Sequence, residues 1–103
     1  MTRAEEIFAR VPKTHNCAQS VAAGCGREDL VAALASCGGG RAPGGLCGAL
    51  YAALLQLPAE QHESAKAEFI RRVGAPDCRT IKSQFKTPCA QCVAAGAEIA
   101  SGR

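Results

Sequence analysis

Apolar positions along the chain recur at intervals of three and four residues, which is the spacing of one face of an α-helix. Leu30, Val31 and Leu34 form one such stripe. A longer apolar run over 46–57 predicts the central helix, and 59–73 places a narrower apolar stripe among Glu, Lys and Arg residues. No segment alternates convincingly with the period of two that predicts a half-buried strand. The pattern therefore predicts an all-α fold.

Capping residues and helix breakers mark where the predicted helices begin and end. Asn, Asp and Pro suit the first positions of a helix, whereas Gly and Pro suit the positions after its end. On these signals we expect a single cysteine-rich domain over residues 1–103, built as a compact bundle of about six or seven short helices. The expected helices span 2–10, 16–24, 27–36, 46–57, 59–73, 78–85 and 88–100.

A glycine-rich segment separates the third and fourth predicted helices. Its glycines are Gly38, Gly39, Gly40, Gly44 and Gly45. Glycine allows positive φ angles and a close approach of the backbone to another group, so we expect a loop here. A phosphate-binding loop would also need a preceding strand and a following Lys-Ser/Thr pair, and the segment has neither.

Composition narrows the kind of core that the bundle can have. The chain is 48% apolar, but it contains three Phe, one Tyr and no Trp, so the core depends on small residues that let helices approach closely. A chain of 103 residues is expected to bury roughly 60–65% of its unfolded surface. A modest core is therefore feasible without obligatory crosslinks.

Charge and hydropathy give no support for a nucleic-acid or membrane partner. The net charge is +3, and basic residues outnumber Asp77 over 71–86, but no aromatic platform accompanies them, so we expect no nucleic-acid binding. The longest apolar run, 49–55, is too short to cross a bilayer, and the N-terminal residues do not read as an export signal. We expect a cytoplasmic protein with no membrane association.

Cysteines are the candidate functional residues. Seven cysteines in a reducing compartment indicate metal binding or redox catalysis rather than a disulfide framework. Four of them fall in the first turn of four different predicted helices, where free amides and the helix dipole favour the thiolate. We therefore take as redox or metal candidates Cys17, Cys47, Cys78 and Cys89.

The three other cysteines are secondary candidates. Cys25 and Cys37 are most simply small buried residues. Cys92 makes the segment Cys89-Ala90-Gln91-Cys92 and leaves open which of its two cysteines is the fourth member of the site. No residue is assigned a catalytic role from the sequence.

Several short motifs carry a family resemblance over about residues 14–100. They are, in order, Asn16-Cys17-Ala18-Gln19, Cys37-Gly38-Gly39-Gly40, Gly44-Gly45-Leu46, Cys47-Gly48-Ala49, Cys78-Arg79, and Cys89 followed by Val93 and Ala97-Glu98-Ile99. Together they resemble the C-GCAxxG-C-C family of redox-active proteins. The resemblance implies a compact helical protein whose redox centre consists of Cys17, Cys47, Cys78 and Cys89.

The resemblance also bears on cofactors. A related domain occurs in the split-Soret cytochromes, where an iron–sulfur centre accompanies haem. We expect no haem here, because the chain has no Cys-x-x-Cys-His motif. The sequence departs from the family at Ala52, where a Gly is usual, and at Cys37 and Cys92, which are additional thiols.

Three chemistries remain open for the cysteines. An iron–sulfur cluster uses four thiolates, structural zinc usually uses two close pairs, and thiol–disulfide exchange needs only two thiols, such as Cys89 and Cys92. We expect the protein to transfer electrons or to sense redox state, together with an unidentified redox partner protein. An iron–sulfur cluster is one cofactor that this protein could use for the purpose. The alternatives are exchange through Cys89 and Cys92, or a zinc-stabilised interaction module. The apolar helix around Leu50, Leu54 and Leu57 could belong to the core or to a homodimer interface.

Overall fold

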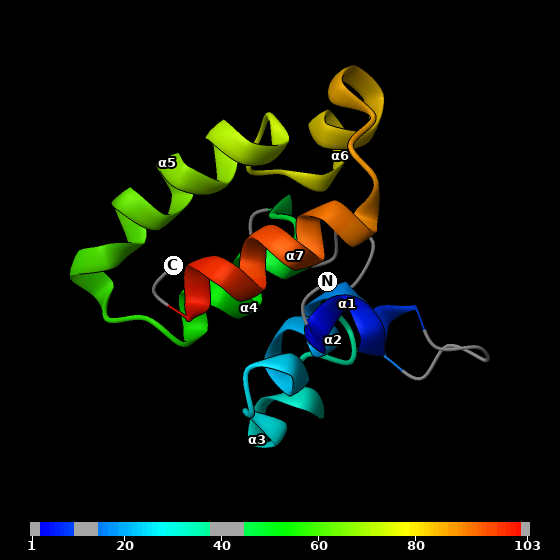
Figure 1. The fold of residues 1–103 in the computed structure, drawn as a ribbon. Coiled ribbons are helices and arrows are strands. Elements are labelled where there is room, and N and C mark those ends of the chain that lie inside the picture. The colour runs from blue at the N-terminus through cyan, green and yellow to red at the C-terminus, as the bar shows by residue number, and fades with distance from the viewer. Residues whose placement is uncertain (1–2, 10–14, 38–44, 102–103) are drawn as a thin grey trace.

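Helices account for most of the chain in the computed structural model, which describes residues 3–9, 15–37 and 45–101 (Figure 1). Seven α-helices lie in these residues and no strand does, which confirms the predicted all-α bundle. They are α1 (Arg3–Phe8), α2 (Cys17–Gly24), α3 (Glu28–Val31), α4 (Gly48–Leu55), α5 (His62–Val73), α6 (Cys78–Thr80) and α7 (Cys89–Ala100). A 3-10 helix, η2 (Ala59–Gln61), precedes α5, and a π-helical turn, η3 (Ile81–Phe85), follows α6.

Helices α4 and α7 pack together at the centre, with α2 and α1 on one side and α5 on the other (Figure 1). The α4–α7 contact is close because Gly96 lacks a side chain: a Cβ there would lie 2.7 Å from the carbonyl oxygen of Ala49. At the α1–α2 contact, a Cβ on Gly24 would lie 2.6 Å from the Ala4 nitrogen. These close helix contacts allow small side chains to pack the core although it contains few aromatic residues. The largest fully buried side chains are Phe69, Leu34, Leu50, Ile81, Val21 and Val93.

Helix α3 is shorter than the predicted helix over 27–36. It ends at Val31, and 3-10-type bonds follow, including Ala35 N to Ala32 O at 3.3 Å and Cys37 N to Leu34 O at 3.0 Å. Two side chains at the start of α2 also donate to this segment, Asn16 to the Leu34 carbonyl and Gln19 to the Val31 carbonyl. Long-range hydrogen bonds thus hold the segment after the helix, and local spacing does not reveal them.

Burial shows which side chains of α5 and α4 face the core. The apolar stripe of 59–73 predicts Phe69, Ile70 and Val73 as inward-facing side chains; Phe69 and Val73 are buried, but Ile70 is 38% exposed. Leu50 and Leu54 are buried in the core, and Leu57 is partly buried against it. The apolar side of α4 is thus mainly internal.

The predicted helix over 78–85 changes type after one turn. The amide of Lys86 donates to the Ile81 carbonyl at 2.6 Å, and Lys86 has a φ of 53°, which closes η3. Gly74 has a φ of 108°, and Phe85 lies so close that a Cβ on Gly74 would be 2.4 Å from its ring. This packing fixes η3 against the end of α5.

Two predicted segments lie partly outside the described residues. From the glycine loop these are Gly38, Gly39, Gly40 and Gly44, and from the first predicted helix they are residues 2 and 10. Gly45 has a φ of 73°, in the left-handed region that glycine favours. Across the described parts of the chain, no helix has the length and apolar character needed to cross a membrane.

Candidate functional site

Asn16 fixes Cys17 at the first position of α2. Its side-chain oxygen accepts from the Gln19 amide at 2.7 Å, and the Gln19 side chain accepts from the Asn16 amide at 3.0 Å, which completes a capping box. The Asn16 side-chain nitrogen also donates to the carbonyls of Leu34 and Ala35 at 3.0 and 3.1 Å. One residue therefore caps α2 and ties its start to the segment after α3.

A backbone contact joins the starts of α4 and α6, where Cys47 and Cys78 lie. Leu46 and Asp77 form an isolated antiparallel bridge, and the Cys47 amide donates to the Pro76 carbonyl at 2.9 Å. Asp77 then caps α6, since its carboxylate accepts from the Thr80 amide at 2.9 Å. The two cysteines are thus held close together although a whole helix separates them in sequence.

Cys89 and Cys92 both lie in the first turn of α7. The predicted helix 88–100 has Pro88 as its first residue, whereas α7 begins at Cys89 and Pro88 is its N-cap. The Pro88 carbonyl accepts from the Cys92 amide at 3.2 Å. The Thr87 hydroxyl donates to the Val73 carbonyl at 2.8 Å, which attaches the start of α7 to the end of α5.

These cysteines line one partly enclosed cavity with a volume of about 20 Å³, which we call the five-cysteine pocket. Cys47 and Cys92 are only 5% and 3% exposed, whereas the three other thiols are partly exposed. A single water occupies ~10–15 Å³ on the same measure, so the pocket holds one group of about that size. The described residues around it are Cys17, Cys47, Cys78, Cys89 and Cys92, with Ile81, Lys82 and Thr87.

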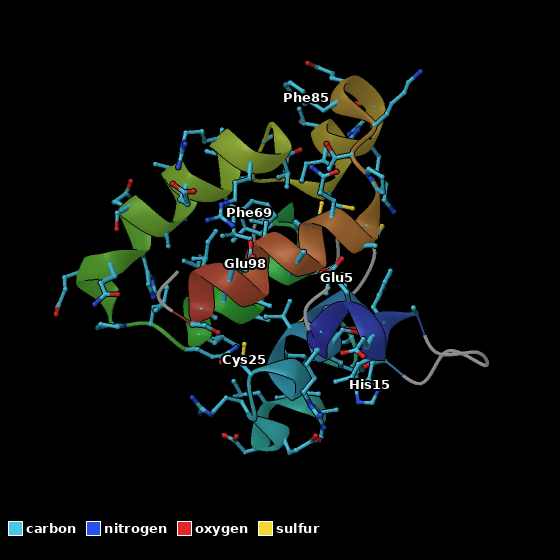
Figure 2. All side chains as sticks on the ribbon, viewed as in Figure 1. Glu5, His15, Cys25, Phe69, Phe85 and Glu98 are labelled. Atoms are coloured by element: carbon cyan, nitrogen blue, oxygen red, sulfur yellow. The ribbon has the colours of Figure 1, made fainter. Side chains whose placement is uncertain are left out.

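The pocket includes all four primary candidates and Cys92, but Cys25 and Cys37 do not line it. Cys25 lies toward the other end of the bundle, with its sulfur 3.7 Å from the Ala97 carbonyl and 3.9 Å from the Ser101 hydroxyl (Figure 2). Burial raises the pKa of Cys25. Cys37 is buried beside the start of α4. All seven cysteines are free thiols.

Gly48 allows the pocket to close around Cys17. A Cβ on Gly48 would lie 2.9 Å from the Cys17 sulfur and 2.7 Å from the Cys37 carbonyl oxygen. The side chain of any other residue would therefore separate α2 from α4 at the cysteines.

Cys47 and Cys92 form the strongest electrostatic pair in the pocket. A hydrogen bond from the Cys92 thiol, helped by the amides of Ala49 and Leu50, lowers the pKa of Cys47 to about 7, although burial opposes the change. The same bond, together with burial, raises the pKa of Cys92 well above its usual range. The pair therefore begins to ionise near neutral pH, and the negative charge resides on Cys47.

Lys82 provides the positive charge of the pocket. The negative charges of Cys89 and then Cys78 raise the pKa of this ammonium group, and the Cys78 side chain also hydrogen-bonds it. Burial, the largest influence, raises the pKa of Cys78, and Lys82 opposes it. Lys82 follows Cys78 by four residues, a spacing that places both on one face of a helix, so the sequence held a local signal for this partner. The Cys47–Cys92 contact had no such signal.

Five thiols are suitable donors for zinc or an iron–sulfur cluster. Within residues 3–9, 15–37 and 45–101, however, no group of three or more His, Cys, Asp or Glu side chains is arranged to hold a metal ion. The donor chemistry fits a soft metal, but the side chains as arranged do not form a ready metal site.

Comparisons with protein-family models, with curated proteins and with solved structures each found no match for this chain. The family resemblance therefore stays a prediction.

Proposed function

We propose that this protein is a redox protein that works by thiol–disulfide exchange in the five-cysteine pocket. The observation that carries the proposal is the hydrogen bond from Cys92 to Cys47 inside a cavity that partly exposed Cys89 also lines. A thiolate that has a neighbouring thiol within hydrogen-bonding reach is the arrangement that exchange requires. This arrangement extends the expected Cys89–Cys92 pair by a third, buried cysteine.

Cys89 is the entry thiol, because it is partly exposed and begins α7. As its thiolate it attacks one sulfur of a disulfide R–S–S–R, so that a mixed disulfide forms and the first thiolate RS⁻ leaves. Cys92 passes its proton to Cys47, attacks the Cys89 sulfur and expels the second thiolate.

The last exchange places the disulfide in the interior. Cys47 releases the proton to a departing thiolate and attacks the Cys92 sulfur, which frees Cys89 again. The products are a Cys47–Cys92 disulfide and two thiolates, which take up the Cys92 proton and one proton from solvent. Two electrons have moved from the protein to the substrate, so atoms and charge balance.

Electron transfer through an iron–sulfur cluster is the second candidate function. It is favoured by one observation: four cysteines from four separate helix starts line a single pocket, in the set that the family resemblance implies. A zinc-stabilised module would use the same donors. Either centre would require the side chains to turn toward a common point.

Disulfide mapping tests the proposal. The protein is purified and reduced without oxygen, freed of metal with a chelator, and oxidised with hydroxyethyl disulfide. We expect the number of free thiols to fall from seven to five, with Cys47 joined to Cys92. Tryptic cleavage separates Cys47, in 42–66, from Cys89 and Cys92, in 87–103, and alkylation of the remaining free thiol before cleavage shows which cysteine of 87–103 is bonded. A Cys47–Cys92 bond joins these two peptides, whereas a Cys89–Cys92 bond stays within one.

Single substitutions supply the controls. Cys47→Ser should leave the oxidised protein with a bond inside 87–103, and Cys25→Ser should change nothing, because Cys25 lies away from the pocket. Retention of all seven thiols would refute exchange. Brown protein with acid-labile sulfide after anaerobic purification would favour the cluster, and colourless protein with one zinc would favour the structural module.

A further inference from the structure

One cationic side chain lies among the thiols of the five-cysteine pocket. Lys82 is the only basic side chain among the described residues that line the pocket. It lies on the connection between α5 and α7, whose exposed side chains include Arg79 and Lys86. The only acidic residue from 75 to 92 is Asp77.

Asp77 does little to cancel this charge at the pocket. Its carboxylate accepts from both the amide and the hydroxyl of Thr80, at 2.9 and 2.6 Å, as the cap of α6. Arg79 is the basic residue whose charge acts on Asp77. Lys82 therefore has no carboxylate partner from this stretch of the chain, and its exposed ammonium group interacts with the pocket thiols, chiefly Cys89 and Cys78.

The size of the pocket determines which part of a substrate meets that charge. A volume of about 20 Å³ admits a group of roughly the size of one water, so a sulfur can approach the thiols while the groups attached to it remain outside. Those groups then lie over Lys82 and the neighbouring turn, where Phe85 is 52% exposed. The rim can therefore select a disulfide by the charge of its substituents.

We propose that the pocket exchanges preferentially with disulfides whose flanking groups carry carboxylates, and that Lys82 is the residue that determines this specificity. The inference rests on the proposed exchange function. An ammonium group donates charge-assisted hydrogen bonds to a carboxylate. Lys82 already hydrogen-bonds Cys78, which holds its amino group beside the reacting sulfurs. The same positive charge stabilises the thiolate that leaves at each exchange.

The test compares three disulfides that differ in charge: the dianion dithiodipropionate, neutral hydroxyethyl disulfide and the dication cystamine. Each rate is measured with the reduced, metal-free protein and divided by the rate of mercaptoethanol with the same disulfide, which removes intrinsic reactivity. We expect the normalised rate for the dianion to exceed that for the dication by about tenfold at low salt, because steering by one charged rim is of that order. At 0.5 M salt the preference should shrink, because screening shortens the reach of the charge.

Variants of Lys82 separate substrate selection from a general effect on the thiols. Lys82→Gln should reduce the dianion-to-dication ratio about fivefold, whereas Lys82→Arg should retain most of it. Lys66→Gln on α5 removes the same charge from a residue that does not line the pocket, so it should leave the ratio unchanged. If Lys82→Gln slows all three disulfides equally, the ratio is unaffected and the inference is wrong.

The two proposals fail in different ways. Exchange with all three disulfides at normalised rates that do not depend on their charge overturns the carboxylate preference alone. Reaction with none of them overturns the exchange function, and the preference with it.

Discussion

Cys92 on α7 donates its thiol hydrogen to the sulfur of Cys47 at the start of α4. The bond shares one proton between two buried sulfurs and leaves the negative charge on the sulfur beside the amides of Ala49 and Leu50. The folded state therefore binds protons at this pair differently from the unfolded chain, and the stability of the reduced protein depends on pH.

We expect the free energy of unfolding of the reduced protein to rise between about pH 7 and pH 9. The folded pKa of Cys47 is lowered from 9.0 to about 7, so in this range the unfolded chain binds more protons than the folded one. Two pKa units correspond to on the order of 3 kcal/mol. Urea unfolding at a series of pH values, with a reductant and a chelator present, measures the rise.

Above about pH 9 the same stability should stop rising and then fall. The pKa values of Cys92, Cys78 and Cys25 are raised, so their contributions to stability are present below the ordinary pKa of 9.0 and are lost as the pH increases past it.

A variant of Cys92 tests the rise between pH 7 and 9. Cys92→Ala removes the hydrogen-bond donor to Cys47 and should flatten this rise in the free energy of unfolding. An unchanged slope in this variant would show that Cys47 is not stabilised by Cys92.

Local signals predict where most cysteines lie relative to the helices. Asp77 is the N-cap of α6, Asn16 stands at the start of α2 within one residue of the predicted helix start, and Pro88 immediately precedes α7. Such caps act within a few residues, so a sequence reveals them. The early end of α3 has no such local signal, since the side chains that bind the segment after it are Asn16 and Gln19, 12 to 19 residues away in sequence. The π-helical turn has no local signal that we recognise either.

The contact between Cys47 and Cys92 could not be predicted, because it depends on how closely α4 and α7 cross. That separation is set by the missing Cβ of Gly96 against the Ala49 carbonyl. Which glycine faces which carbonyl is a property of the packed fold. The sequence identifies each of the four helix-start cysteines as a candidate. The contact between the sulfurs of Cys47 and Cys92 is visible only in the structure.

Gly96→Ala should therefore loosen the contact between the buried pair. Its new methyl group would overlap the Ala49 carbonyl oxygen, 2.7 Å away, and we expect a loss of about 1–3 kcal/mol of stability, as for other overpacked cores. The Cys47–Cys92 disulfide should also form more slowly on oxidation. Peptide mapping over time after addition of hydroxyethyl disulfide measures that rate, and a wild-type rate would contradict the prediction.

Gly48→Ala should disturb a different part of the pocket. The added Cβ would lie within 3 Å of the Cys17 sulfur and the Cys37 carbonyl oxygen, so α2 and α4 must separate. We expect about 1–3 kcal/mol of destabilisation, and faster alkylation of Cys17 by iodoacetamide under native conditions. Mass spectrometry of the alkylated peptides reports which thiol reacts.

Gly24→Ala is the matched control for Gly48→Ala. Its Cβ would overlap the Ala4 backbone at 2.6 Å, in the α1–α2 contact and away from the lining of the pocket. It should destabilise the fold to a similar degree without a selective increase in Cys17 alkylation. Equal alkylation patterns in both variants would mean that Gly48 acts only through global stability.

Asn16 combines two roles that substitution can separate. Asn16→Ser keeps an oxygen that can cap α2 but cannot reach the carbonyls of Leu34 and Ala35, so it should cost about 1–2 kcal/mol for the two lost hydrogen bonds. Asn16→Ala also removes the cap and should cost about 1 kcal/mol more. Urea unfolding gives both values, and hydrogen exchange gives their location: the amides of 34–37 should exchange faster in both variants, whereas the start of α2 should loosen only in Asn16→Ala. Wild-type protection of 34–37 in Asn16→Ser would show that the hydrogen bonds from Asn16 do not hold this segment at the start of α2.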